Sequence, residues 1–146
     1  MDPPEPVPGV GDGLALDDLT GEAIDAVVTT AVPPLLSLEL RQLGGALATP
    51  SAGHGAVGSL TAGYAMFAVG FAPTPEVGAA VGAALDRAKA ALGPWQSERA
   101  YFNFAERGVD PAGLYPPEAY RRLRRVKAAY DPGDLFLANH PIPALR

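Results

Sequence analysis

Tyr101 and Asn103, separated by one residue, are the side chains in this sequence best suited to carry chemistry. A phenol can donate, accept or release a proton, and a carboxamide can both donate and accept hydrogen bonds. If this segment is a strand, Tyr101 and Asn103 share one face near Arg99, and Phe102 and Phe104 share the other. The pattern leaves two interpretations open: the wall of a binding site, or a polar pair satisfied at the surface.

A second polar pair lies in residues 35–41, where leucines alternate with other side chains. A period of two predicts a strand with its leucines on one face and Glu39 and Arg41 on the other. That second face can meet either solvent or a ligand, and spacing alone does not decide between them.

The rest of the side-chain inventory excludes many kinds of site. The chain has no Cys and two His, which excludes disulfides, thiol catalysis and iron–sulfur clusters and argues against an all-protein zinc site. His54 lies in a loop of small residues without an acid or a nucleophile at useful spacing. The basic residues at 121–127 are interpreted as a solvated helix face, because no base-stacking aromatic platform accompanies them. The net charge of −5 also argues against a broad nucleic-acid surface.

A chain of 146 residues with 48% hydrophobic residues predicts one domain with a real core. Hydrophobic periodicity and capping residues, such as Thr74 before Pro75, predict its elements. The predicted helices cover residues 20–31, 75–92 and 117–130, and the predicted strands cover 35–41, 64–71, 100–104 and 135–137. The expected fold class is α+β, an antiparallel sheet with helices packed on one side.

Residues 1–19 are predicted to be a flexible, acidic arm rich in Pro and Gly, and residues 20–146 form the folded part. No apolar run approaches the length of a membrane span. No cationic and apolar leader is visible, so a cytoplasmic location is expected.

An ordered set of residues in the last third resembles a known family signature. In chain order the set is Tyr101, Asn103, Tyr120, Leu123, Val126, Lys127, Tyr130, Asp131, Pro132, Asp134, Phe136, Asn139 and Ile142. It is similar to the C-terminal end of the berberine bridge enzyme-like, FAD-linked oxidases of the vanillyl-alcohol oxidase superfamily. The berberine-like segment covers about 99–143, and the resemblance extends upstream to about Thr20. It implies a partial substrate domain, whose sheet covers the flavin of a separate FAD-binding domain.

The resemblance also implies roles for individual residues. Tyr101 would be catalytic, taking a proton from an alcohol or sugar-like substrate as hydride leaves for FAD. Because a phenol ordinarily titrates near pH 10, its anion would need stabilising, by Arg99 or by the flavin environment. The cofactor-binding residues would be Asn103 and Asn139, and the substrate-binding residues would be Glu39 and Arg41. Where the family usually has a second amide after Asn139, this chain has Pro141, which lacks a backbone N–H.

Two functions therefore remain open. In the first, the chain is a C-terminal fragment of an FAD-dependent oxidoreductase, active only when an FAD-binding domain complements it. Alternatively, it is a catalytically silent remnant or interaction module that keeps the substrate-domain fold. In that case its exposed sheet face would drive self-association. The expected partners are the FAD-binding domain and a small-molecule substrate, with no metal, nucleic acid or membrane.

Overall fold

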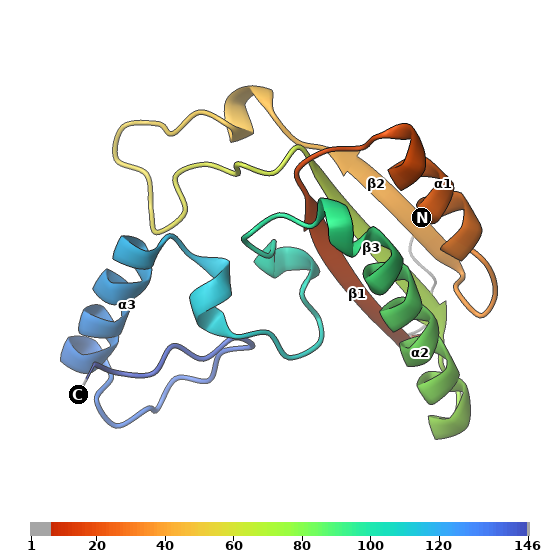
Figure 1. Cartoon of the computed structure of the whole chain (residues 1–146). Coiled ribbons are helices and arrows are strands. Elements are labelled where there is room, and N and C mark those ends of the chain that lie inside the picture. Colours follow the sequence, from red (N-terminus) through yellow and green to blue (C-terminus); the bar gives the residue numbers. More distant parts are fainter. Residues whose placement is uncertain (1–6, 146) are drawn as a thin grey trace.

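The computed structural model describes residues 7–145, which contain a three-stranded antiparallel sheet, three α-helices and four short 3-10 helices (Figure 1). The order of the strands in the sheet is β1-β3-β2. The strands are β1 (Gly9–Leu16), β2 (Ser37–Gln42) and β3 (Tyr64–Phe71), the α-helices are α1 (Gly21–Thr30), α2 (Pro75–Leu92) and α3 (Pro117–Tyr130), and the 3-10 helices are η1 (Gly45–Leu47), η2 (Gly93–Trp95), η3 (Phe102–Phe104) and η4 (Pro111–Leu114).

Strand β3 is the centre of the sheet, as its apolar character on both faces predicts. It pairs antiparallel with β1 from Gly9↔Phe71 to Leu16↔Tyr64, along the full length of both strands. On its other side it pairs antiparallel with β2. The strand predicted at 35–41 thus forms with a shift of one or two residues at its ends.

Strand β1 corrects the prediction of a flexible arm over residues 1–19. Residues 1–6 of that arm lie outside the described residues, but Gly9–Leu16 pair with β3, and Leu14, Ala15 and Leu16 are buried. The glycines at 9, 11 and 13 hide the strand from sequence analysis, because glycine has no side chain to alternate and is uncommon in strands.

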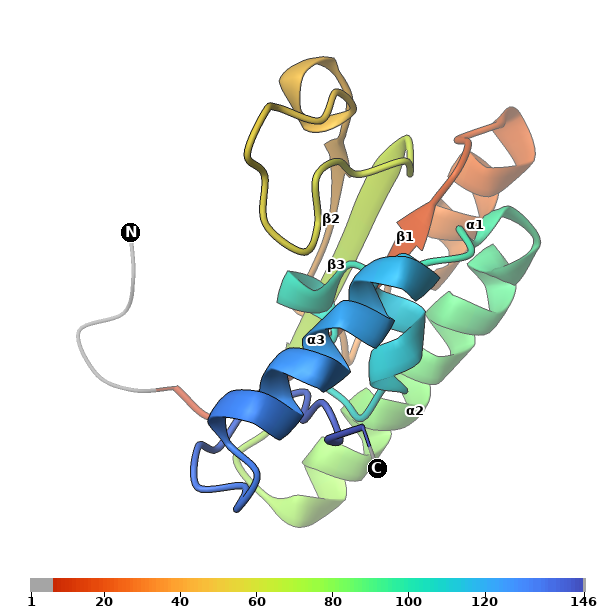
Figure 2. The same cartoon turned by 90° about the vertical axis from the view of Figure 1, so that its left-hand side faces the viewer.

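Helices α1 and α2 cover one face of the sheet and confirm that part of the predicted architecture. The core lies between this layer and the sheet, where Leu16 and Met66 pack with Val81 and Leu85 of α2. Helix α3 lies apart from this layer, and none of its residues is fully buried (Figures 1 and 2). Among residues 7–145 there is no helix with the length and apolar character that a membrane crossing requires.

Two predicted strands are wrong. Residues 102–104 form the 3-10 helix η3, and residues 135–137 have no regular structure. Over residues 7–145 the sheet consists of β1, β3 and β2 alone, so neither of these short segments pairs with a strand. A run of three to five residues is too short a signal to distinguish a strand from a turn.

We expect replacement of Thr74 by alanine to lower the free energy of unfolding by about 1 kcal/mol. The Thr74 hydroxyl accepts a hydrogen bond from the Val77 amide at 3.4 Å and caps α2, the helix that supplies more buried core residues than any other element. Urea denaturation measures the effect. Replacement of Thr29 by alanine is the matched control, because the exposed Thr29 hydroxyl bonds only a carbonyl inside α1. Equal losses in both variants would contradict a capping role.

Candidate active site

The sheet face away from α1 and α2 carries an aromatic cluster that we call the aromatic face. Phe67 of β3 packs on Phe104 with ring centroids 5.1 Å apart, and Phe104 packs on Tyr101 at the same distance. A Cβ on Gly13 would lie 2.5 Å from the Cβ of Phe104, and one on Gly11 would lie 2.6 Å from the ring of Phe67. The two glycines of β1 therefore make the space in which these aromatic rings lie.

The 3-10 helix η3 begins directly after Tyr101 and places Asn103 against the Tyr101 side chain. The Asn103 side-chain amide donates a hydrogen bond to the Tyr101 hydroxyl oxygen at 3.0 Å. Since this bond uses a lone pair of that oxygen, the hydroxyl hydrogen stays free to bond a ligand. Tyr101 and Asn103 therefore lie side by side, as predicted. The predicted strand that would place them on one face is wrong, because the segment forms a 3-10 helix.

Glu39 and Arg41 lie on the aromatic face, as the alternation in β2 predicts. They form an ion pair at 2.8 Å, and the guanidinium carbon of Arg41 lies 4.9 Å from the centre of the Phe104 ring. Both side chains remain partly exposed, so the pair itself adds little stability. Phe104 therefore contacts both Arg41 and Tyr101. It connects the predicted substrate-binding pair on β2 with the predicted catalytic residue.

Asn139 lies in a second place, a groove of about 740 Å³ that Asn103 also lines. The other groups in this groove include His140 and Arg107. The two asparagines predicted to bind the cofactor therefore line one groove, which lies beside η3.

Arg99 lies in a different place. It donates a hydrogen bond to the Thr61 hydroxyl at 2.8 Å and lines a small cavity with Tyr101.

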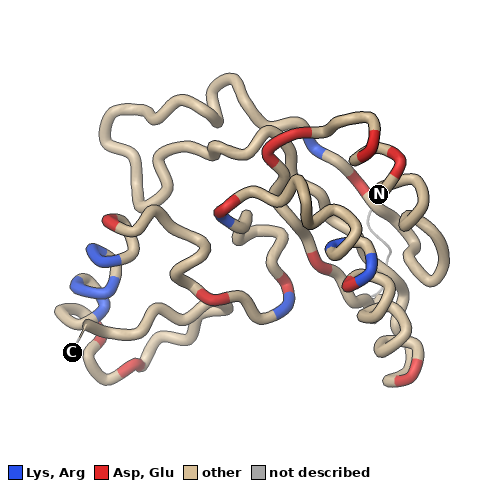
Figure 3. The backbone as a smooth tube through the Cα atoms, viewed as in Figure 1, with Lys and Arg blue, Asp and Glu red and all other residues tan. Residues whose placement is uncertain are grey.

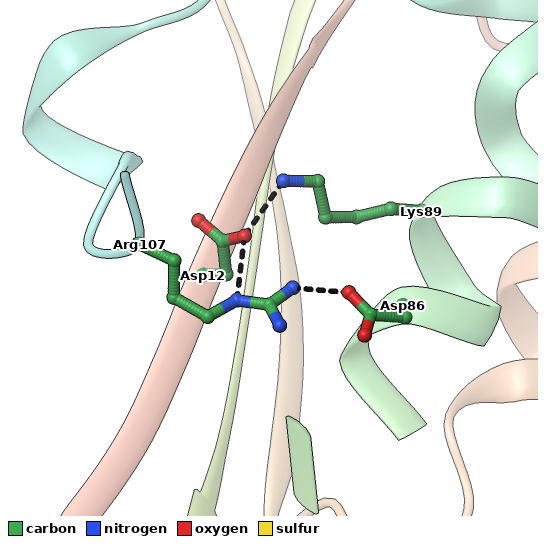
Figure 4. A network of polar contacts seen from close by, with 4 residues as sticks. All are labelled: Asp12, Asp86, Lys89 and Arg107. Carbon is green, nitrogen blue, oxygen red and sulfur yellow. Dashed lines mark hydrogen bonds and ion pairs between the residues drawn. The ribbon is translucent and has the colours of Figure 1, made fainter. Parts of the chain in front are cut away.

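A buried carboxylate anchors the loop that follows η3 (Figure 4). Asp12 of β1 is 2% exposed and contacts Lys89 at 2.6 Å and Arg107 at 3.0 Å. Arg107 also donates to Asp86 of α2 at 2.6 Å, so its guanidinium joins the loop to both the sheet and the helix layer. The hydrogen bond to Asp86 is the main cause that raises the pKa of Arg107, and the same bond lowers the pKa of Asp86. This network fixes the end of the segment that carries Tyr101 and Asn103.

Comparisons with known proteins address the same part of the chain. Residues 100–143 match the sequence model of the family described as "Berberine and berberine like". We call residues 100–143 the berberine-like segment. Among curated protein sequences, none matches the chain significantly.

Solved structures extend the similarity to nearly the whole chain. The Physcomitrella patens BBE-like 1 protein matches over 99% of this chain with a TM-score of 0.83 and 15% identity. The grass pollen allergen Phl p 4, described as having glucose dehydrogenase activity, matches over 94% with a TM-score of 0.73 and 17% identity. The Bermuda grass isoallergen BG60 matches over 94% at 18% identity, also with a TM-score of 0.73. The chain spans about a third of the length of each, 32%, 33% and 33% in that order. The fold is therefore that of a part of the BBE-like proteins.

The berberine-like segment holds a closed turn after α3 that we call the Asp131 clasp. The buried Asp131 carboxylate contacts the Lys127 ammonium at 2.5 Å and accepts hydrogen bonds from the Leu135 and Phe136 amides at 2.8 and 3.2 Å. The Lys127 ammonium also contacts Asp134 at 2.5 Å. The hydrogen bond from Lys127 is the main cause that lowers the pKa of Asp131, and the hydrogen bond to Asp131 is the main cause that raises that of Lys127.

We expect the Asp131 clasp to open only at a pH below the ordinary aspartate value of 3.8. A carboxylate whose pKa is lowered by its folded contacts gives its full stabilisation above that ordinary value and loses it as the pH falls through the lowered one. The Leu135 and Phe136 amide resonances, followed by NMR, measure the opening. In Asp131→Asn these resonances should be displaced at neutral pH, whereas in Asp134→Asn they should stay close to the wild-type positions. A wild-type midpoint at or above 3.8 would contradict the expectation.

Three residues of this site are not predicted from the sequence. The alternation in residues 101–104 predicts Phe104 on the face away from Tyr101, and Gly13 and Asp12 belong to the predicted flexible arm. The alternation of glycines at positions 9, 11 and 13 around Asp12 is the one sequence pattern that could have indicated Asp12 and Gly13. The partners of these residues are distant in sequence, at positions 67, 89 and 107, so local pattern could not identify them.

Proposed function

We propose that this chain is the substrate-domain part of an FAD-dependent oxidoreductase that oxidises an alcohol or sugar-type substrate, and that it acts together with an FAD-binding domain. The observation that carries the proposal is the Asn103–Tyr101 hydrogen bond on the aromatic face, within the berberine-like segment. The glucose dehydrogenase activity in the description of Phl p 4 makes a sugar the first substrate to try.

The residues present fit the ring of a flavin better than its diphosphate. A flavin ring has carbonyl and N–H groups along its edge, and a carboxamide can serve both. Asn103 and Asn139 present two carboxamides at one groove. The sequence has no glycine-rich phosphate loop, so an FAD-binding domain would have to hold the rest of the cofactor.

Each site residue has one task in the proposed reaction. FAD supplies, when bound, a two-electron acceptor for a hydride. Tyr101, in its deprotonated form, takes the substrate hydroxyl proton at its oxygen as the carbon gives up the hydride. The Asn103 N–H stabilises the negative charge on that oxygen before the proton arrives. Glu39 and Arg41 can bond the other hydroxyls of a polar substrate, because carboxylate and guanidinium groups accept and donate respectively.

The test is reconstitution with an FAD-binding domain. The chain is co-expressed with an FAD-binding domain supplied as a separate polypeptide, and the purified pair is mixed anaerobically with glucose, other sugars and benzylic alcohols. We expect the visible absorbance of the flavin to bleach with one of these classes. A pair that binds FAD but is bleached by none of them would instead favour the catalytically silent interaction module.

A further inference from the structure

A groove of about 690 Å³ lies between α3 and the loop that joins η1 to β3. Figure 1 shows this loop, in yellow, reaching the start of α3. The groove shares no residue with the one that Asn103 and Asn139 line, and its volume is typical of small-molecule sites. We call it the α3 groove, and its lining includes no residue that the proposed reaction uses.

The five basic side chains of α3, whose positions are blue in Figure 3, divide into two groups. Those with partners within the chain, either carboxylates or carbonyl oxygens, are Arg121, Arg124 and Lys127. Over residues 7–145, Arg122 and Arg125 have no such partner, and these two line the α3 groove. The cations that the fold leaves uncompensated are therefore the ones placed at this groove.

The α3 groove is cationic, in a chain whose net charge is −5. Arg122 and Arg125 are three residues apart on the helix, so their side chains are neighbours on its surface. Arg99 also lines the groove, so three guanidinium groups meet one carboxylate there, that of Glu118, which already pairs with Arg121. Guanidinium groups bind carboxylates and phosphates through paired N–H groups, so this lining favours an anionic ligand.

An apolar stripe of α3 lies beside these cations. Ala119, Leu123 and Val126 all line the groove and recur at the spacing of one helix face. Val126 is 44% exposed, so much of its side chain is open to a ligand. On the opposite wall, Pro50 and Ala56 add further apolar surface. A ligand that fits this lining has an apolar body as well as an anionic group.

The opposite wall also holds His54 in a fixed position. Its Nδ1 donates a hydrogen bond to the Gly55 carbonyl oxygen at 2.8 Å. A Cβ on Gly58 would lie 2.7 Å from the imidazole ring, so the ring packs directly on this glycine. Nε2 then remains as the ring nitrogen that can bond a ligand. The loop therefore presents an ordered polar group to the groove.

We propose that the α3 groove is a binding site for an organic anion with an apolar body. Arg122 and Arg125 hold its carboxylate or phosphate group, and the apolar body lies on Leu123 and Val126. Because guanidinium groups bind both kinds of head group, the experiment compares the two. The site is independent of the proposed function and can be tested on the full chain without FAD.

Isothermal titration calorimetry of the full chain with three probes measures the affinity. Octanoate, octyl phosphate and octanol have similar apolar bodies and differ in the head group. We expect octanoate or octyl phosphate to bind at least roughly 10-fold more tightly than octanol, the usual contribution of a charge-assisted hydrogen bond. The tighter of the two anions identifies the head group. Equal affinities for all three probes, or no binding of either anion, would overturn the proposal.

Two double variants that remove the same charge locate the interaction. Arg122→Gln/Arg125→Gln removes the two cations of the groove and should weaken binding of the preferred anion roughly 10- to 100-fold. Arg87→Gln/Arg124→Gln is the matched control, because it removes one cation from α2 and one from a part of α3 outside the groove. It should leave the dissociation constant nearly unchanged. Circular dichroism and thermal unfolding verify that both variants fold. Equal losses in the two would reveal a general effect of net charge and overturn the site.

The apolar half of the site has its own variant. Val126→Ser should weaken binding of the preferred octyl anion and leave binding of its head group alone, as acetate or inorganic phosphate, unchanged. NMR spectra recorded with the preferred anion should show displaced amide resonances in residues 54–59 and 118–126, the segments that line the α3 groove. Unchanged affinity in Val126→Ser, or displacements confined to residues 102–108 and 138–140 of the other groove, would overturn the proposal.

Discussion

Replacement of Tyr101 by phenylalanine is expected to slow flavin reduction in the reconstituted pair by roughly 10²- to 10⁴-fold, the usual contribution of a positioned acid or base. Phenylalanine keeps the ring contact with Phe104 at 5.1 Å and removes only the oxygen that Asn103 bonds. The folding and the association of the chain should therefore be unchanged. Anaerobic stopped-flow measurement of flavin absorbance gives the rate.

Saturation with substrate distinguishes a proton acceptor from a residue that merely packs. In the Tyr101→Phe variant, the limiting rate of flavin reduction at saturating substrate should fall, whereas the substrate dissociation constant should stay close to that of the wild type. Asn103→Ala should also lower the limiting rate, because it removes the N–H that bonds the Tyr101 oxygen. Tyr130→Phe is the matched control, since this tyrosine is 82% exposed and lies outside the site. An unchanged limiting rate in Tyr101→Phe would exclude Tyr101 as the proton acceptor.

The parts of the fold that sequence analysis predicted correctly are those with local signals. Thr74 and Pro75 define the start of α2, and the alternating leucines of residues 35–41 define both β2 and the face on which Glu39 and Arg41 lie. Capping and periodicity act over a few residues, so one sequence contains them in full.

The errors arise where distant residues decide the structure. Strand β1 exists because β3 pairs with it and α2 covers it, and a Gly-rich segment gives little local indication of this. The turn at Phe102–Phe104 is fixed by packing of Phe104 on Phe67 and by the anchoring of Arg107 at Asp12. The sequence therefore indicates which residues belong to the candidate site. It does not indicate how they are arranged, because tertiary contacts determine that arrangement. The predicted roles of Tyr101, Asn103 and Asn139 stay predictions that the experiments above test.

The second large effect is expected when Asp12 is replaced, because the loop after η3 is attached to the sheet through its carboxylate. Replacement of Asp12 by alanine should lower the free energy of unfolding by roughly 2–4 kcal/mol. Removal of one partner from a buried ion pair typically costs about 3–5 kcal/mol. The loss here is expected towards the lower end, because the side chains of Lys89 and Arg107 are each 34% exposed and can regain water. Urea denaturation at neutral pH gives the value from the transition midpoint.

The same substitution should also reach the candidate active site. Arg107 holds the loop three residues beyond Phe104, so its release from Asp12 should increase amide hydrogen exchange across residues 101–107 more than in α2. Asp86→Ala is the matched control: it removes the other carboxylate bound to Arg107, but that side chain is 67% exposed and its loss should matter far less. A double-mutant cycle with Arg107→Ala isolates the coupling to Asp12. If Asp12→Ala and Asp86→Ala were equally stable, or if exchange rose uniformly, the buried carboxylate would not be the anchor of the turn that positions Tyr101.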